Sequence, residues 1–389
     1  MRIITIVGAR PQFIKIAPLV RVFQQEGISH QLVHTGQHYD YEMSKIFFEE
    51  LELPEPDYHL EVGSGPHGEQ TGEALKRAEG VLLEEQPDWV LVYGDTNSTL
   101  AGALAAAKLH IPVAHIEAGL RSYNRHMPEE INRILTDHLA TLLCCPTETA
   151  VATLRAEGFV HIAHEGRLLS DQEAENLAGL PPTAVPLVVN TGDVMYDAYL
   201  LGQEMAARQS KIVEQLGLAP RAFFLATVHR AENTDDPRAL ARILEAFKEL
   251  SRRHPLIWPL HPRTRQTLAD TGLAARLDEA PRVQLLAPVG YFDMLALERD
   301  AATILTDSGG IQKEAFFAGT PCVTLRTETE WVETVAAGLN ILAGTDPESI
   351  IVAALQPRKR QVETQPYGTG DAAGKILKGI SGLARSLQK

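Results

Sequence analysis

Short apolar runs rich in valine and isoleucine recur along the first part of the chain, between longer stretches with helical spacing of apolar residues. The runs are RIITIV (2–7), HQLVHTG (30–36), WVLVYGD (89–95), PVAHIEA (112–118) and TLLCCP (141–146). Each has the length of a strand and no polar face, which is typical of strands buried on both sides in a parallel sheet. Stretches such as 97–109 and 129–140 are predicted as helices between them. The alternation predicts a doubly wound α/β domain.

The same pattern begins again after a polar, proline-containing connection. The second set of runs is PLVVNTG (186–192), AFFLATVH (222–229), LIWPLH (256–261), VQLLAP (283–288), ATILTD (302–307) and PCVTLR (321–326). A chain of 389 residues also exceeds the usual size of one core. We therefore predict two Rossmann-like domains, 1–165 and 186–370, with an amphipathic helix at 371–389 that joins the first. Such sheets bind ligands at the carboxyl ends of their strands, so we expect them to face a cleft.

Composition narrows the function classes. The chain is 44% hydrophobic and 22% charged, as expected of a globular protein, and its net charge of −14 argues against a nucleic-acid surface. No run approaches the roughly 18 apolar residues of a membrane span. The three cysteines suggest neither a disulfide framework nor a metal site, and His161 and His164 have no matching ligand cluster. We expect a cytoplasmic protein with no membrane, nucleic-acid or metal partner.

Polar residues concentrate at the predicted strand ends of the first domain. Arg10 and Lys15 follow the first strand and place two cations beside a helix start, although Arg10 could equally pair with a local carboxylate. Asp95, Glu117 and Glu129 end two strands and begin a helix. Each acid alone fits a structural role, but three acids at one sheet edge could supply a general base and a general acid.

In the second domain, the stretch LTDSGGIQKEA ends a strand and begins a helix. Ser308 could simply cap that helix, but Ser308, Gly309 and Gly310 would also expose backbone N–H groups to a phosphate. Glu314 is placed to accept hydrogen bonds from ribose hydroxyls. His229 ends another strand beside an arginine, which favours phosphate binding over a purely structural role. A nucleoside diphosphate sugar fits these residues better than a bare phosphate.

Six stretches together resemble the non-hydrolysing UDP-N-acetylglucosamine 2-epimerases over almost the whole chain. They are GARPQFIKIAPL, YGDTNSTLAGALAAAKLHIPVAHIEAGLRS, MPEEINRILTDH, TVHRAEN, LTDSGGIQKEA and YGTGDAA. The resemblance implies a glycosyltransferase-B-like pair of domains, a homodimer and no redox cofactor. It also implies anti elimination of UDP to a glycal intermediate, followed by re-addition with inversion at C2.

The resemblance assigns roles to single residues. The catalytic group is Asp95, Glu117, Glu129 and His229. The residues matched to UDP binding and to other active-site contacts are Arg10, Lys15, Arg133, Ser308, Gly309, Gly310, Glu314 and Arg326. His229 also matches a position that binds UDP. Gln37, Gln70 and His261 match an allosteric site for UDP-N-acetylglucosamine.

The chain also departs from the family pattern. Tyr39 and Glu69 stand where a well-known bacterial branch has basic residues of the allosteric site, and no role is predicted for 161–182. The stretch GPHGEQTG resembles that of enzymes that epimerise UDP-2,3-diacetamido-2,3-dideoxyglucuronate. The alternatives to a UDP-N-acetylglucosamine 2-epimerase are therefore that epimerase, a UDP-sugar-dependent glycosyltransferase and a nucleotide-sugar sensor.

Overall fold

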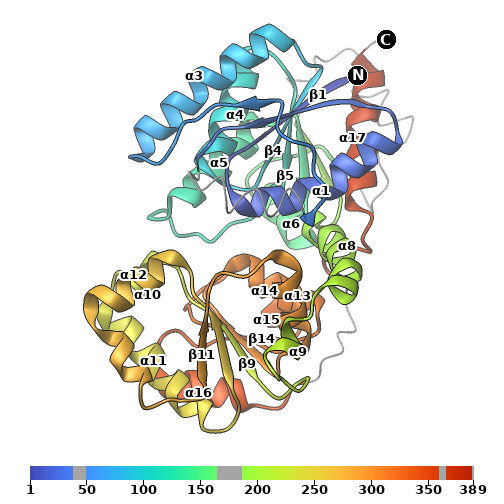
Figure 1. Ribbon diagram of the computed structural model, residues 1–389. Coiled ribbons are helices and arrows are strands. Elements are labelled where there is room, and N and C mark those ends of the chain that lie inside the picture. The colour runs from blue at the N-terminus through green and yellow to red at the C-terminus, as the bar shows by residue number, and fades with distance from the viewer. Residues whose placement is uncertain (38–49, 164–185, 359–364, 388–389) are drawn as a thin grey trace. The chain divides into compact units, whose positions relative to one another are not determined.

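The computed structural model describes residues 1–37, 50–163, 186–358 and 365–387. The chain divides into two compact units, Met1–Leu200 with Pro366–Lys389, and Leu201–Gln365 (Figure 1). Each unit contains one parallel β-sheet with helices on both faces. The two doubly wound α/β domains predicted from the alternating pattern are confirmed.

The first unit contains an eight-stranded sheet with the order β3-β2-β1-β4-β5-β6-β8-β7. Its strands are β1 (Arg2–Val7), β2 (Ser29–His34), β3 (Tyr58–His59), β4 (Trp89–Tyr93), β5 (Val113–Ile116), β6 (Leu142–Cys145), β7 (Ile162–Ala163) and β8 (Leu187–Asn190). All paired strands run parallel. The order reverses between β1 and β4, and the carboxyl ends of strands at such a reversal are the usual ligand site of an open α/β sheet.

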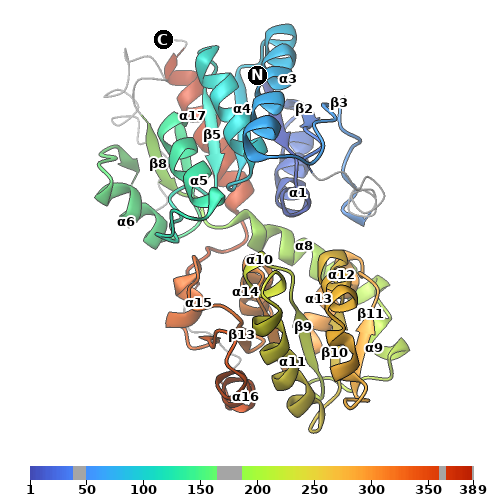
Figure 2. The same ribbon diagram turned by 90° about the vertical axis from the view of Figure 1, so that its left-hand side faces the viewer.

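Helices of the first unit cover both faces of this sheet (Figure 2). They are α1 (Arg10–Gln25), α3 (His67–Glu85), α4 (Asn97–Lys108), α5 (Pro128–Leu139), α6 (Glu148–Ala156), the beginning of α8 (Val194–Gln209) and α17 (Ala372–Leu387). One core joins α1 and α17 through side chains such as Phe13, Phe23, Ile376 and Ile380. The other core lies under α3, α4 and α6. The C-terminal helix is thus part of the first unit.

The predicted start of the second domain at residue 186 is wrong. Strand β8 pairs with β6 and β7 in the first sheet, and the first compact unit continues to Leu200. The run PLVVNTG is apolar on both faces, and either sheet could bury it. Local pattern therefore could not decide which sheet it joins.

The second unit contains a six-stranded sheet with the order β11-β10-β9-β12-β13-β14. Its strands are β9 (Phe224–Thr227), β10 (Leu256–Pro259), β11 (Val283–Leu286), β12 (Thr303–Thr306), β13 (Cys322–Thr324) and β14 (Asn340–Leu342). Its helices after α8 are α9 (Ile212–Gln215), α10 (Ala231–Thr234), α11 (Pro237–Ser251), α12 (Pro262–Thr271), η2 (Leu273–Leu277), α13 (Tyr291–Asp300), α14 (Gly309–Phe317), α15 (Val332–Ala336) and α16 (Pro347–Leu355). The sequence analysis missed β14, which has only three residues.

A partly buried histidine in β2 is expected to make the first unit sensitive to acid. His30 Nε2 lies 2.9 Å from Thr5 Oγ1. Burial lowers the pKa of His30 to about 4, although the Asp57 carboxylate acts in the opposite direction. The unfolded chain binds this proton below about pH 6.5, so protons favour unfolding between about pH 6.5 and 4. We expect the free energy of unfolding to fall over that range by up to about 3 kcal/mol because of His30.

This expectation is checked by denaturant unfolding at pH 7 and pH 4.5. His30→Gln should flatten the acid dependence, whereas His126→Gln, which changes an exposed histidine, should not. Equal acid dependence in the wild type and His30→Gln would contradict the assignment.

Candidate active site

The first group of candidate residues lies where β4 and β5 end. Asp95 comes two residues after β4, and Glu117 follows β5 directly. Glu117 has a positive φ of 70°, which costs a non-glycine residue about 1–3 kcal/mol and is common at functional sites. Lys15 forms an ion pair with Glu117, and their side chains are 13% and 3% exposed. A Cβ at Gly94 would lie 3.4 Å from Glu117 Oε2, so the Glu117 carboxylate packs beside the turn that carries Asp95.

Helix α1 carries both cations predicted to follow the first strand, Arg10 and Lys15. Its N-terminus is anchored to the end of β4. Gln12 Oε1 accepts hydrogen bonds from the backbone N–H groups of residues 8 and 9, at 2.8 and 3.0 Å. Gln12 Nε2 donates to the Tyr93 carbonyl at 2.7 Å. Arg10 is the first residue of α1, and Lys15 follows just over one turn later. The anchoring therefore fixes the helix that brings Lys15 to Glu117.

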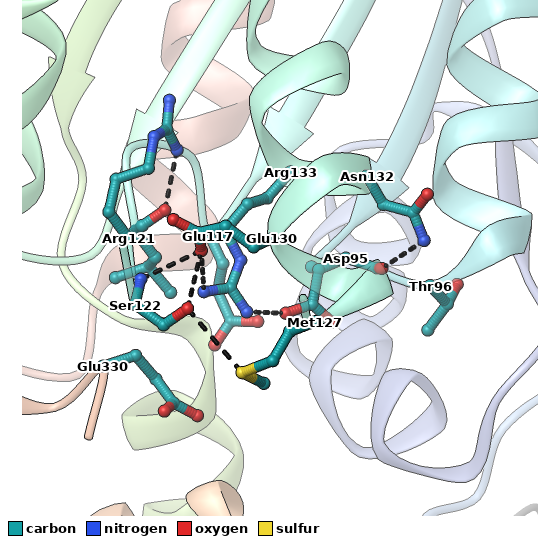
Figure 3. A network of polar contacts seen from close by, with 12 residues as sticks. Asp95, Thr96, Glu117, Arg121, Ser122, Met127, Glu130, Asn132, Arg133 and Glu330 are labelled. Atoms are coloured by element: carbon teal, nitrogen blue, oxygen red, sulfur yellow. Dashed lines mark hydrogen bonds and ion pairs between the residues drawn. The ribbon is translucent and has the colours of Figure 1, made fainter. Parts of the chain in front are cut away.

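Arg133 of α5 connects Asp95 with a second carboxylate (Figure 3). Its Nη2 atom pairs with Asp95, and Nη1 lies 3.0 Å from Glu130 Oε2. The Arg133 side chain is 4% exposed, whereas the Asp95 side chain is 32% exposed. Asn132 Nδ2 also donates to the Asp95 carbonyl at 2.9 Å. Helix α5 thus holds the Asp95 turn while the Asp95 carboxylate remains accessible.

The two adjacent glutamates at the start of α5 have different surroundings. Glu130 is buried and accepts hydrogen bonds from the N–H groups of Ser122 and Tyr123, both at 2.9 Å. Glu129 is exposed, and its side chain forms no hydrogen bond or ion pair with the described residues. Successive helical residues point about 100° apart, so one glutamate closes the loop after Glu117 and its neighbour does not. The sequence analysis named Glu129 and missed the positioning role of Glu130.

In the second unit, Asp307 organises the loop that follows β9. Its carboxylate accepts hydrogen bonds from the backbone N–H of His229 at 3.1 and 3.0 Å and of Arg230 at 3.0 Å. It also accepts from Asn233 Nδ2 at 3.0 Å, and His229 Nδ1 lies 3.5 Å from Oδ1. Asp307 is fully buried. This residue, which the sequence analysis did not name as a site residue, therefore sets the position of His229.

Helix α14 begins directly after Asp307. Ser308 Oγ caps it by accepting from the Ile311 N–H at 3.5 Å, so the structural role considered for Ser308 is present. Gly309 and Gly310 form the first turn of the helix. The positive end of the helix dipole and the N–H groups there favour an anion. The capped corner and a phosphate site are compatible, because the cap uses only one of these N–H groups.

The Glu330 carboxylate lies at this helix start. Arg326 Nη1 lies 3.1 Å from Glu330 Oε2, and Arg230 Nη2 lies 3.8 Å from Glu330 Oε1. A Cβ at Gly309 would come within 2.6 Å of Glu330 Oε1, so only glycine lets Glu330 approach. Arg326 is buried, and its Nε and Nη2 atoms have no hydrogen-bond partner among the described residues. These surroundings are cationic and attract negative charge.

Glu314 of α14 is nearly buried and packs against a second acid from α13. Glu298 is fully buried, and burial together with the Glu314 charge raises the pKa of Glu298 well above its usual range. The Glu314 carboxylate therefore lies beside an acid whose neutral form is favoured by burial.

The three residues matched to an allosteric site belong to two different units. Gln37 and Gln70 are joined in the first unit, where Gln70 Nε2 lies 3.5 Å from the Gln37 carbonyl. Gln37 Oε1 accepts from Ser98 Oγ at 2.7 Å, and Gln70 Oε1 accepts from Asn97 Nδ2 at 2.8 Å. His261 belongs to the second unit, where it caps α12 and its ring centroid lies 5.3 Å from that of His229. Both glutamines thus have structural partners at the start of α4.

Two of the departures from the family pattern lie wholly or mostly outside the described residues. Tyr39 is not described, and neither is most of the stretch 161–182. Glu69 lies in the first turn of α3, where a carboxylate suits the helix dipole.

A family model described as UDP-N-acetylglucosamine 2-epimerase matches residues 21–381. The chain belongs to this family. The resemblance recognised from the six motifs is therefore confirmed, and the relatives are isomerases.

Individual epimerases match along nearly their full lengths. A Pseudomonas aeruginosa UDP-2,3-diacetamido-2,3-dideoxy-D-glucuronate 2-epimerase is 47% identical over 387 residues, covering 98% of this chain and 100% of the relative. The crystal structure of Methanocaldococcus jannaschii UDP-GlcNAc 2-epimerase with UDP-GlcNAc and UDP is 41% identical, with a TM-score of 0.85 and coverage of 98% and 99%. The S. aureus MnaA-UDP co-structure is 31% identical, with a TM-score of 0.82 and coverage of 100% and 98%. Both units thus have the glycosyltransferase-B-like fold of these epimerases.

Two structural features are absent from the described residues of this epimerase family member. None of the helices there combines the length and apolarity needed to cross a membrane. No group of three or more histidine, cysteine, aspartate or glutamate side chains in the same part of the chain has the arrangement of a metal site.

Proposed function

We propose that the chain is a UDP-N-acetylglucosamine 2-epimerase that interconverts UDP-N-acetylglucosamine and UDP-N-acetylmannosamine. The observation that carries this proposal is the buried Lys15–Glu117 pair beside Asp95 at the carboxyl ends of β4 and β5. A binding protein for nucleotide sugars needs no strained, buried carboxylate next to a second acid. An enzyme that moves the C2 proton does need such a pair.

The second unit supplies the groups that bind UDP in this proposal. The diphosphate is held by the N–H groups of Gly309 and Gly310 and by the Arg326 Nε and Nη2 atoms, which have no hydrogen-bond partner in the described part of the chain. They also stabilise the negative charge that develops on it when the C1–O bond breaks. The Glu314 carboxylate accepts hydrogen bonds from the ribose hydroxyls. Arg10 and His229 contribute further contacts to UDP, as the family resemblance implies.

The first unit supplies the proton chemistry. A carboxylate removes the C2 proton, the electron pair forms the C1–C2 double bond, and UDP leaves with the electrons of the C1–O bond. In the reverse steps UDP adds to C1 of the glycal, and an acid returns a proton to the other face of C2. Asp95, Glu117 and Glu129 divide these tasks. Oxidation states balance over the whole reaction, so the proposal includes no redox cofactor.

A second candidate substrate is UDP-2,3-diacetamido-2,3-dideoxyglucuronate. The Pseudomonas aeruginosa relative of that name favours it, as does the stretch GPHGEQTG. Both reactions exchange the C2 proton, so one experiment separates them. Each nucleotide sugar is incubated with the protein in deuterated water, and C2 deuterium and the new epimer are followed by NMR.

The outcome of this experiment also tests the reaction class. We expect deuterium at C2 of one of the two sugars without any acceptor. A glycosyltransferase of the same fold would release UDP only when an acceptor is added. Absence of exchange with every UDP-2-acetamido sugar would contradict the epimerase proposal. From the family resemblance we further propose a homodimer, which sedimentation of the purified protein tests. We also propose a cytoplasmic location.

Nucleotide affinity should depend on Ser308 and Glu314. Loss of the ribose acceptor in Glu314→Ala should raise the dissociation constant for UDP about tenfold or more, because hydrogen bonds to a charged group contribute roughly 1.5–3 kcal/mol. Ser308→Ala should raise it by a smaller factor. Calorimetric titration with UDP measures the dissociation constant of each variant. Glu279→Ala is the control, because it removes an exposed glutamate that pairs with Lys248. Unchanged UDP affinity in Glu314→Ala would refute its role.

A further inference from the structure

A buried carboxylate of α5 contacts the turn that carries Glu117 and a histidine of β5. Asp137 is fully buried. Its Oδ1 atom lies 2.7 Å from His115 Nδ1 on β5, and its two oxygens accept the Gly119 N–H at 3.4 and 3.2 Å. Arg121 Nη1 lies 2.7 Å from Oδ2. One carboxylate thus holds the strand before Glu117 and the turn after it.

His115 extends the same contact to the turn of Asp95. Its Nε2 atom lies 2.7 Å from the Gly94 carbonyl, while Nδ1 faces Asp137. A carbonyl and a carboxylate both accept hydrogen bonds, so each ring nitrogen of His115 faces an acceptor. The ring thus bridges the Asp137 carboxylate and the Gly94 carbonyl.

Arg121 pairs with both carboxylates of this cluster. Asp137 faces His115 and Arg121, and Arg121 also pairs with Glu157 at 2.6 Å. The Asp137 carboxylate is thus paired inside the protein. Removing one partner of such a buried ion pair strongly destabilises the folded protein. The cluster therefore forms a rigid support.

The turn supported by Asp137 needs such a support. Glu117 and Gly119 have φ values of 70° and 80°. A Cβ at Gly119 would lie 2.5 Å from the Ala150 carbonyl, so the turn packs closely against α6. The conformation that presents Glu117 is unfavourable by itself and persists only where its surroundings hold it.

We propose that Asp137 is a positioning residue for the epimerisation, which holds the Glu117 turn through Gly119 and the Asp95 turn through His115. This inference rests on the proposed function, because it assumes that these two acids transfer the C2 proton. Proton transfer depends on the placement of the acid within hydrogen-bond reach of its target. Removing the charge of Asp137 loosens both acids at once without touching the substrate.

The test compares Asp137→Asn with Asp197→Asn. Asp197 is a buried carboxylate of the same unit that accepts the N–H groups of Ala372 and Ala373 at 3.2 and 2.9 Å, far along the chain from the acids. We expect Asp137→Asn to lower kcat for C2 deuterium exchange at least tenfold, with UDP affinity within twofold of the wild type. Asp197→Asn should lower the thermal midpoint but change kcat less than twofold. All rates are measured well below each variant's midpoint.

A second variant keeps the proposal testable if Asp137→Asn does not fold. In His115→Asn the new amide still donates to Asp137 but no longer reaches the Gly94 carbonyl. It should lower kcat by a smaller factor with unchanged UDP affinity. The proposal is overturned if Asp137→Asn and His115→Asn, or whichever of the two folds, keep kcat within twofold of the wild type. It is also overturned if kcat falls as much in Asp197→Asn as in Asp137→Asn.

A spectroscopic arm separates this proposal from the proposed function. Nitrogen-15 NMR of the wild type should show both His115 nitrogens protonated at neutral pH, and Asp137→Asn should remove one of these signals. A single protonated nitrogen in the wild type would overturn the arrangement. If the wild type exchanges no deuterium, the function fails whatever the His115 signals show.

Discussion

Glu117→Gln is expected to lower the rate of deuterium incorporation at C2 by about 10²–10⁴-fold, the usual contribution of a general acid or base. Glutamine has the same shape as glutamate, so it can keep its contact with Lys15, but it neither accepts nor returns a proton. Because UDP contacts are proposed to lie mainly on the second unit, the dissociation constant for UDP should stay within about twofold. A time course followed by NMR measures the rate of deuterium incorporation, and calorimetric titration measures the dissociation constant for UDP.

The control for this prediction is Glu84→Gln, which changes an exposed glutamate of α3 in the same unit. It should leave both exchange and UDP binding unchanged. Asp95→Asn and Glu129→Gln should behave as Glu117→Gln does, and a loss of UDP affinity in either would reassign that residue to binding. Exchange at the wild-type rate in Glu117→Gln would remove Glu117 from the mechanism.

Asp307→Asn should have the largest effect on the second unit. The variant loses the charge that binds the N–H groups of His229 and Arg230 and the amide of Asn233. Breaking a buried, charge-assisted set of contacts costs about 3 kcal/mol or more. We therefore expect the free energy of unfolding to fall by about that amount and the dissociation constant for UDP to rise at least tenfold.

Denaturant unfolding and calorimetric titration test this prediction. Asp346→Asn is the matched control, because Asp346 caps α16 of the same unit through the Ser349 N–H at 2.9 Å. It should lower stability only slightly and leave UDP affinity unchanged. If Asp307→Asn destabilises the protein but binds UDP like the wild type, Asp307 supports the fold without setting the binding loop.

The neighbouring acids of α5 show where residue pattern stops being informative. The sequence PEEINR places Glu129 and Glu130 in the first turn of a helix, and either could serve as a dipole partner or an acid. Only the folded loop, whose N–H groups at Ser122 and Tyr123 turn toward Glu130, separates their roles. Asp137 and Asp307 escaped notice for the same reason, since their partners lie far from them in sequence.

The sequence by itself determined the two doubly wound units, most of their strands and the motifs at the strand ends. It could do so because apolar runs, helical spacing and glycine-rich corners are local properties that each segment carries. Tertiary structure alone decided that β8 joins the first sheet and that Glu130 closes the loop after Glu117. It also decided that Asp137 contacts the Glu117 turn directly and the Asp95 turn through His115. These outcomes depend on which buried donor meets which acceptor across the core, and no segment specifies its partner by its own pattern.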